Sequence, residues 1–139
     1  MSAGDAFFDT NVLLYLLSAD AAKADRAEEL LAGEGVISVQ VLNEFASVAS
    51  RKLRMPWADI NEVLTQVRAV CEVRALSIET HEQAMQLAER YGLSVYDALI
   101  VSAALLSACK TLWSEDMQDG QVVNRQLTIR NPFGRLAKV

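Results

Sequence analysis

The sequence has 139 residues, of which 52% are hydrophobic, and a formal net charge of −5 at pH 7. This length and apolar fraction predict one globular domain over residues 1–139, with no room for a second. The acidic balance excludes a protein that coats nucleic acid through a general basic surface, but it permits an enzyme that holds metal with carboxylates.

Along the chain, short apolar runs alternate with segments whose apolar residues recur every three or four positions. These are the patterns of buried strands and amphipathic helices. The predicted strands are Ala6–Phe8, Val36–Ile37, Val73–Leu76, Thr111–Trp113 and a last apolar stretch near Leu127–Ile129. The predicted helices are Ala19–Ala32, Val39 to about Leu53, one after Pro56, one from Thr80 to Gly92, and Ala98–Ala108.

Residues at helix ends sharpen these predictions. Gly33 is expected to close the first helix as its C′ residue. Thr80 with Gln83, and Ser94 with Asp97, have the spacing of capping boxes, in which a side chain at the helix start and another three residues later satisfy free backbone N–H groups. Asp97 is therefore expected in the first turn of a helix.

Strands separated by helices predict an α/β fold with a mostly parallel sheet covered on both faces. In such sheets, ligands bind outside the carboxyl ends of the strands. Asp9 and Asp116 each follow a predicted strand, and Asp97 opens a helix that is expected to begin at the same edge. The sequence therefore predicts an acidic site at this edge.

Asp9, Glu44, Asp97 and Asp116 are the candidate metal ligands. Magnesium prefers oxygen ligands, and carboxylates from different segments can supply them. Two unscreened carboxylates about 4 Å apart repel by roughly 4 kcal/mol at an effective dielectric near 20, and a bound cation offsets this repulsion. Such an ion also acidifies water and neutralises charge on a phosphodiester. Phosphodiester hydrolysis is the chemistry that this set of residues favours.

Each acid also has an explanation without function. Asp9 and Asp116 are suited to turns after strands, and Glu44 to a solvated helix face. Asp97 is explained by the capping box alone. Taken one by one, these residues leave both interpretations open.

The remaining chemistry-bearing residues carry weaker signals. Arg51, Lys52 and Arg54 end the helix that carries Glu44, where they could meet RNA phosphates or simply complement the helix C-terminus. His81 lies outside every motif and is expected to be structural or exposed. The sequence also lacks a cluster of histidines or a CxxC pair, so Cys71 and Cys109 are expected to be reduced core thiols.

The longest apolar run, Ala98 to Cys109, has 12 residues, well short of the roughly 20 that a membrane-spanning helix needs. We expect a buried helix there and no membrane association. No basic segment followed by an apolar stretch opens the sequence, so the expected location is the cytoplasm.

Four ordered segments resemble the motifs of PIN-domain ribonucleases: Phe8 to Tyr15 (FDTNVLLY), Asn43-Glu44, Tyr96 to Ile100 (YDALI) and Ser114 to Gly120 (SEDMQDG). Within that family the short chain and the closing Asn131-Pro132-Phe133 look most like VapC-type toxins of toxin–antitoxin pairs. The resemblance implies a three-layer α/β/α sandwich and an endoribonuclease that depends on Mg²⁺ or Mn²⁺. It also implies a homodimer and a cognate antitoxin as partners.

The same resemblance assigns roles to the acids. Asp9 matches the first metal ligand, and Asp97 matches an acid that helps to hold the same ion. Glu44 matches an acid that binds metal or orients the attacking water. Asp116 matches the fourth acid, for which Asp119 is a possible substitute.

Thr10 resembles a hydroxyl that supports the site from behind the ligands, and Asn11 is expected to do likewise. The main alternative is a PIN-fold module that no longer cleaves and acts through protein or RNA contacts. A phospho-receiver domain is excluded because Asp9 is not paired with a second acid and Lys110 precedes its strand.

Overall fold

The computed structural model describes residues 3–133. Its elements in chain order are η1 Ala3–Asp5, β1 Ala6–Phe8, α1 Thr10–Leu14, η2 Tyr15–Leu17, α2 Ala21–Ala32, β2 Gly35–Ser38, α3 Val39–Arg51, α4 Trp57–Val70, β3 Cys71–Arg74, α5 Ile78–Tyr91, α6 Val95–Leu106, β4 Thr111–Trp113, β5 Val122–Val123 and β6 Leu127–Arg130. The single domain expected over residues 1–139 includes residues 1–2 and 134–139, which lie outside the described residues.

The strands form one sheet in the order β3-β2-β1-β4-β6-β5. All neighbouring pairs are parallel except β5 with β6. The central pair β1 and β4 aligns Phe8 with Trp113, so the residues that follow these strands emerge side by side. The predicted α/β fold with a mostly parallel sheet is confirmed.

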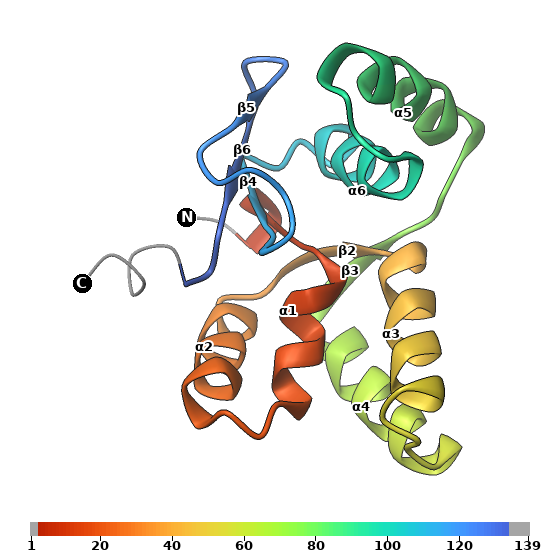
Figure 1. Ribbon diagram of the computed structural model, residues 1–139, viewed down its shortest axis with the longest axis vertical. Coiled ribbons are helices and arrows are strands. Elements are labelled where there is room, and N and C mark those ends of the chain that lie inside the picture. Colours follow the sequence, from red (N-terminus) through yellow and green to blue (C-terminus); the bar gives the residue numbers. More distant parts are fainter. Residues whose placement is uncertain (1–2, 134–139) are drawn as a thin grey trace.

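Helices cover the two faces of the sheet, with α1 to α4 on one side and α5 and α6 on the other (Figure 1). Right-handed crossovers produce this arrangement, because the chain moves outward from β1 to β2 to β3 and then returns past β1 to β4. The crossovers around β1 and β4 consequently lie on opposite faces. A crevice is expected between the carboxyl ends of these two strands.

The sheet supplies the centre of the core. Phe7, Phe8, Ile37 and Leu112 are fully buried, as expected for strands covered on both faces. Gly35 allows β2 to approach β1, because a Cβ there would lie 2.6 Å from the Phe8 ring. These contacts pack β1 closely against β2 and so position the residue that follows β1.

The long apolar run forms α6, whose inner residues are buried as expected. No helix in the described part of the chain is long and apolar enough to cross a membrane. Cys71 and Cys109 are free and buried, which confirms that they are core thiols.

Some local predictions were wrong. The helix α5 begins with a capping box formed by Ser77 and Thr80, not by Thr80 and Gln83. Gly33 does end α2 as predicted, but with φ −76°; the left-handed conformation expected of a C′ glycine is adopted by Glu34, with φ 60°. β3 also begins two residues earlier than the strand predicted at Val73.

Candidate functional site

Asp9 lies directly after β1, where the carboxyl ends of β1 and β4 lie side by side. Its backbone N–H continues the strand pairing by donating to the Trp113 carbonyl at 3.0 Å. One carboxylate oxygen accepts from the Thr10 backbone N–H at 2.7 Å and caps α1, and the other accepts from the Ser114 hydroxyl at 2.7 Å. The carboxylate is thus held by the start of α1 and by the residue that follows β4.

The Asp9 side chain is only 7% exposed. Burial raises the pKa of Asp9 from 3.8 to about 6, although the hydrogen bonds from Ser114 and Thr10 lower it. The charges of Asp97 and Asp116 raise the same pKa further. The fold therefore holds a carboxylate where its negative charge is unfavourable, and a nearby cation would relieve both desolvation and repulsion.

Asp97 lies in the first turn of α6. Its backbone N–H donates to the Ser94 hydroxyl at 3.2 Å, so the predicted cap at Ser94 is present. Burial, followed by the charge of Asp116, raises the pKa of Asp97, while a hydrogen bond with Ser94 lowers it. Asp97 therefore takes part in capping α6 and also lies near the other acids.

Asp116 follows β4 and accepts a hydrogen bond from the Asn11 side-chain amide. Its charge acts on both Asp9 and Asp97. Asp119, the possible substitute, instead accepts from the backbone N–H of Asn131 at 2.9 Å. The structure thus brings Asp116 to the other acids and places Asp119 where it fastens the loop after β4 to the end of β6.

Glu44 reaches the site from the middle of α3. One of its oxygens accepts from the Gln40 amide at 2.9 Å and from the Thr10 hydroxyl at 3.4 Å. The same Gln40 amide lies 3.3 Å from the Tyr96 carbonyl. Glu44 is consequently positioned by residues of α1 and α3, and α3 is tied to the start of α6.

Two residues of this network, Ser114 and Gln40, were missed by sequence reasoning. Ser114 follows β4 as Asp9 follows β1, and Gln40 precedes Glu44 by about one helical turn. These positions could have indicated both residues, but neither residue type is distinctive on its own.

The donor set suits a hard divalent cation, because every candidate ligand is a carboxylate. Among residues 3–133, no three Asp, Glu, His or Cys side chains converge into a ready-made metal cluster. Mg²⁺ does not require one, since it usually keeps several waters and is held by one or two carboxylates. The raised pKa of Asp9 is the feature here that a bound cation would counteract.

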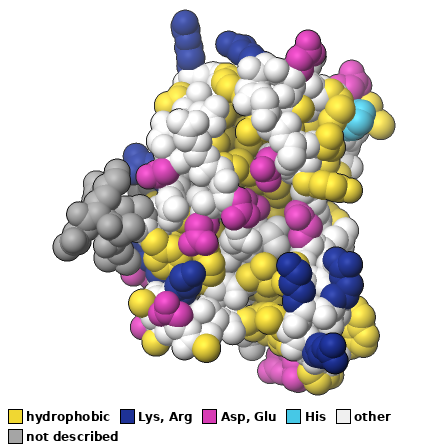
Figure 2. All heavy atoms as spheres, viewed as in Figure 1, with side chains coloured by type: hydrophobic (Ala, Val, Ile, Leu, Met, Phe, Trp, Pro, Cys, Tyr) yellow, Lys and Arg dark blue, Asp and Glu magenta, His cyan; other side chains and the backbone are white. Residues whose placement is uncertain are grey.

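Acidic side chains gather across the middle of the face shown in Figure 2, and Lys and Arg side chains lie beside them over α3. Arg51, Lys52 and Arg54 are all exposed, at and just beyond the end of this helix. Arg51 lies about two helical turns after Glu44, so the two side chains project from the same side of α3. His81 is exposed on α5.

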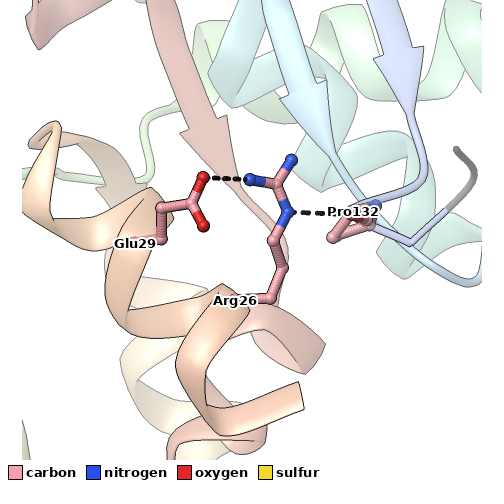
Figure 3. Close-up of polar contacts among 3 residues, drawn as sticks. All are labelled: Arg26, Glu29 and Pro132. Atoms are coloured by element: carbon pink, nitrogen blue, oxygen red, sulfur yellow. Dashed lines mark hydrogen bonds and ion pairs between the residues drawn. The ribbon is translucent and has the colours of Figure 1, made fainter. Parts of the chain in front are cut away.

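Arg26 of α2 contacts the end of β4 and the chain after β6. Its guanidinium donates to the Pro132 carbonyl at 3.0 Å and pairs with Glu29 at 2.9 Å (Figure 3). It also lies over the Trp113 ring, 5.4 Å from the ring centre. Because Trp113 immediately precedes Ser114, this contact supports the strand end that holds Asp9.

The PIN domain family model matches residues 6–118. Among solved structures, a toxin–antitoxin complex from Klebsiella pneumoniae is 22% identical, with a TM-score of 0.69 over 91% of this chain and 97% of that chain. A VapBC pair from Rickettsia felis, bound to a DNA fragment from its promoter, is 20% identical, with a TM-score of 0.65 over the same shares.

A sarcin-ricin-loop-cleaving VapC toxin from Mycobacterium tuberculosis is 20% identical, with a TM-score of 0.62 over 80% of this chain and 91% of that chain. At these identities the likeness establishes the fold. No curated protein matches the sequence significantly.

Proposed function

The chain belongs to the PIN-domain family, and from this premise we propose that it is a metal-dependent endoribonuclease that hydrolyses RNA phosphodiester bonds. One observation carries the proposal. Asp9, Asp97 and Asp116 come from three separate segments, yet their charges act on one another at the carboxyl end of the sheet. This repulsion does not help the chain to fold, whereas acidic side chains that lie close together are what a cation site requires.

In the proposed site Asp9 and Asp97 hold the metal ion, Mg²⁺ or Mn²⁺, and Asp116 completes the acidic set. When bound, the ion supplies charge neutralisation on the phosphodiester and acidifies water. Glu44 accepts a proton from the attacking water or orients it. Ser114 and Thr10 keep Asp9 in place, and Asn11 does the same for Asp116.

RNA is the proposed substrate. Arg51, Lys52 and Arg54 provide a cationic patch at and just beyond the end of the helix that carries Glu44, and cations of this kind neutralise phosphates along a backbone. An acidic site alone would repel RNA. With both the cationic patch and the acidic site, an RNA chain can bind along α3 while the phosphate to be cleaved lies near the acids.

We further propose that the protein is the toxin of a toxin–antitoxin pair, acts in the cytoplasm as a homodimer, and is held by a cognate antitoxin. The similar structures support the antitoxin partner, since two of them are toxin–antitoxin assemblies. Light scattering of the purified protein tests the dimer. A single monomeric mass at all concentrations would remove that part of the proposal.

The central test is cleavage of structured and single-stranded RNAs by the purified protein with Mg²⁺, with Mn²⁺ and with EDTA. Asp9→Asn and Asp97→Asn are the site variants, and Asp25→Asn, an exposed acid of α2, is the matched control. We expect cleavage that needs metal and is lost in both site variants but kept in the control.

Absence of cleavage of every RNA, together with no metal binding by calorimetry, would overturn the enzyme assignment. The PIN-fold module that acts only by binding would then be the better explanation.

A further inference from the structure

A pocket of about 370 Å³ lies beside Glu44, between α3, the segment after β3 and the start of α6. It is lined by Gln40, Asn43, Glu44, Leu76, Tyr96 and Leu99. The pocket shares Glu44 with the candidate site, so a group bound here lies next to the acids. The proposed role of the four acids as a metal site does not explain why the fold leaves this pocket open.

Its walls are mostly apolar. Tyr96 is 67% exposed and Leu76 is 43% exposed, which is unusual for large side chains that could pack inside. No lining residue carries a positive charge, so the pocket is unsuited to a phosphate. A flat, uncharged ring is a better match, because an exposed tyrosine ring offers a face for stacking.

The polar groups of the pocket lie at its α3 side. Asn43 is exposed, and within residues 3–133 its side-chain amide makes no hydrogen bond that would occupy it. An amide offers one acceptor and two donors, the combination that reads the edge of a nucleobase. Glu44 adds an acceptor at the boundary with the catalytic acids.

Gln40 fixes the width of the pocket. Its amide nitrogen lies 2.9 Å from a Glu44 oxygen and 3.3 Å from the Tyr96 carbonyl, so it links the wall formed by α3 to the wall formed by α6. Gln40 is itself only 7% exposed. The two walls are therefore held at a set separation without a ligand, which is the arrangement expected of a preformed subsite.

We propose that this pocket receives an unpaired nucleobase of single-stranded RNA, stacked on Tyr96 and read by Asn43, next to the phosphodiester that is cut. The inference rests on the proposed ribonuclease function and names where its sequence preference arises. An apolar side chain from a protein partner is a poorer occupant, because it would bury the Asn43 amide without a hydrogen-bond partner.

The test uses fluorescence anisotropy with short single-stranded oligoribonucleotides that differ in one base, in an Asp9→Asn background so that the RNA stays intact. Tyr96→Ala is expected to weaken binding by roughly 5- to 150-fold, since it removes one stacked base. Tyr96→Phe keeps the ring and is expected to bind as the parent does. Asn43→Ala is expected to flatten the preference among the four bases.

Cleavage by the same pocket variants, made with Asp9 intact, separates the two proposals. If RNA is cut but Tyr96→Ala and Asn43→Ala change neither affinity nor base preference, the pocket assignment is overturned and the enzyme assignment stands. If oligonucleotides bind with the expected dependence on Tyr96 but nothing is cut, the enzyme assignment fails instead. Loss of a dimer in Tyr96→Ala with RNA binding unchanged would show that protein covers the pocket.

Discussion

The surroundings of Asp9 act on its charged form in opposite directions. Its carboxylate caps α1 and accepts from Ser114, and both contacts favour the charged form. Burial and the neighbouring acids oppose that form more strongly, so the pKa rises to about 6. Such a raised pKa in a crevice is typical of functional sites, where the fold tolerates a local cost.

These opposing effects predict how stability depends on pH. The pKa of Asp9 is about 6 in the folded chain against an ordinary 3.8, so the folded chain binds more protons between these values. The free energy of unfolding of the metal-free protein then falls as pH rises through this window. This difference between the folded and the ordinary pKa of Asp9 corresponds to roughly 3 kcal/mol. Asp9→Asn removes this cost and is expected to stabilise the protein by up to that amount at neutral pH.

Urea denaturation in EDTA at about pH 7.5 and about pH 4 measures the effect. The gain in Asp9→Asn is expected at the higher pH and should largely vanish at the lower one, where the wild-type carboxyl is protonated. Asp25→Asn on the exposed face of α2 should change neither value. Equal stability of wild type and Asp9→Asn at both pH values would contradict the account of Asp9.

At the scale of elements, α3 connects the acids to the cationic patch. Glu44 contacts Gln40 and Thr10, while Arg51 projects from the same side about two turns later. The helix C-terminus also favours cations, so both interpretations of these residues agree with their position. Only binding measurements separate them.

Replacing Arg51 and Arg54 with Ala is expected to weaken RNA binding and to reduce its salt dependence. Each lost phosphate contact on single-stranded RNA should lower the slope of log affinity against log salt by about 0.7. Arg68→Ala is the control, since Arg68 is exposed in the last turn of α4. This helix leads into β3, which is an edge strand of the sheet. An unchanged slope in the double variant would assign Arg51 and Arg54 to the helix end alone.

The contacts of Arg26 join α2 to β4 and to the chain after β6. A hydrogen bond from a charged group to a carbonyl contributes about 1.5–3 kcal/mol, and a cation over an aromatic ring adds about 0.5–1 kcal/mol where exposed. Some of this is offset by side-chain ordering. Arg26→Ala is therefore expected to lower the free energy of unfolding by about 1–3 kcal/mol.

Glu29→Ala is the matched control, because it removes only the ion pair seen in Figure 3, in which Glu29 is 71% exposed. Exposed pairs of this kind contribute little, so its stability should stay within about 0.5 kcal/mol of wild type. Equal losses in the two variants would show that the ion pair, not the contacts to Pro132 and Trp113, stabilises this junction.

At the scale of the whole molecule, the net charge of −5 and the mutual repulsion of Asp9, Asp97 and Asp116 predict that divalent cations stabilise the fold. A ligand that binds only the folded state adds about 2.7 kcal/mol at a concentration 100 times its dissociation constant. Mg²⁺ or Mn²⁺ should therefore raise the melting temperature of the wild type and of Asp25→Asn. The rise should be absent in Asp9→Asn, and a rise of the same size in that variant would place the bound ion elsewhere.

Much of the fold could be predicted because its signals are local. The strands Ala6–Phe8 and Thr111–Trp113 have the bounds predicted for them, since buried strands are continuous apolar runs. The helix α1 was not predicted, because five residues after a capping aspartate are too short to show a period. The two-residue strand β5 was missed for the same reason.

Asp9, Asp97 and Asp116 could also be named from the sequence, because each follows a strand or opens a helix at one edge of a parallel sheet. Glu44 lies in the middle of α3 and was named through the resemblance to PIN-domain motifs. The neighbours of these acids could not be named from the sequence. Ser114 and Asp9 are 105 positions apart, and Gln40 and Tyr96 are 56 apart. The local sequence pattern does not reveal such pairs, because each contact depends on which strands and helices become neighbours.

The sequence by itself thus determined the order of the main strands and helices, the parallel sheet and the position of Asp9, Asp97 and Asp116 at one edge, all of which follow from hydrophobic period and capping residues. The tertiary structure alone decided that Asp116 meets the other acids while Asp119 fastens the end of β6, and that a pocket opens beside Glu44. The physical reason is that strand pairing and helix packing set distances between residues far apart in the chain, and charge interaction and pocket shape depend on those distances.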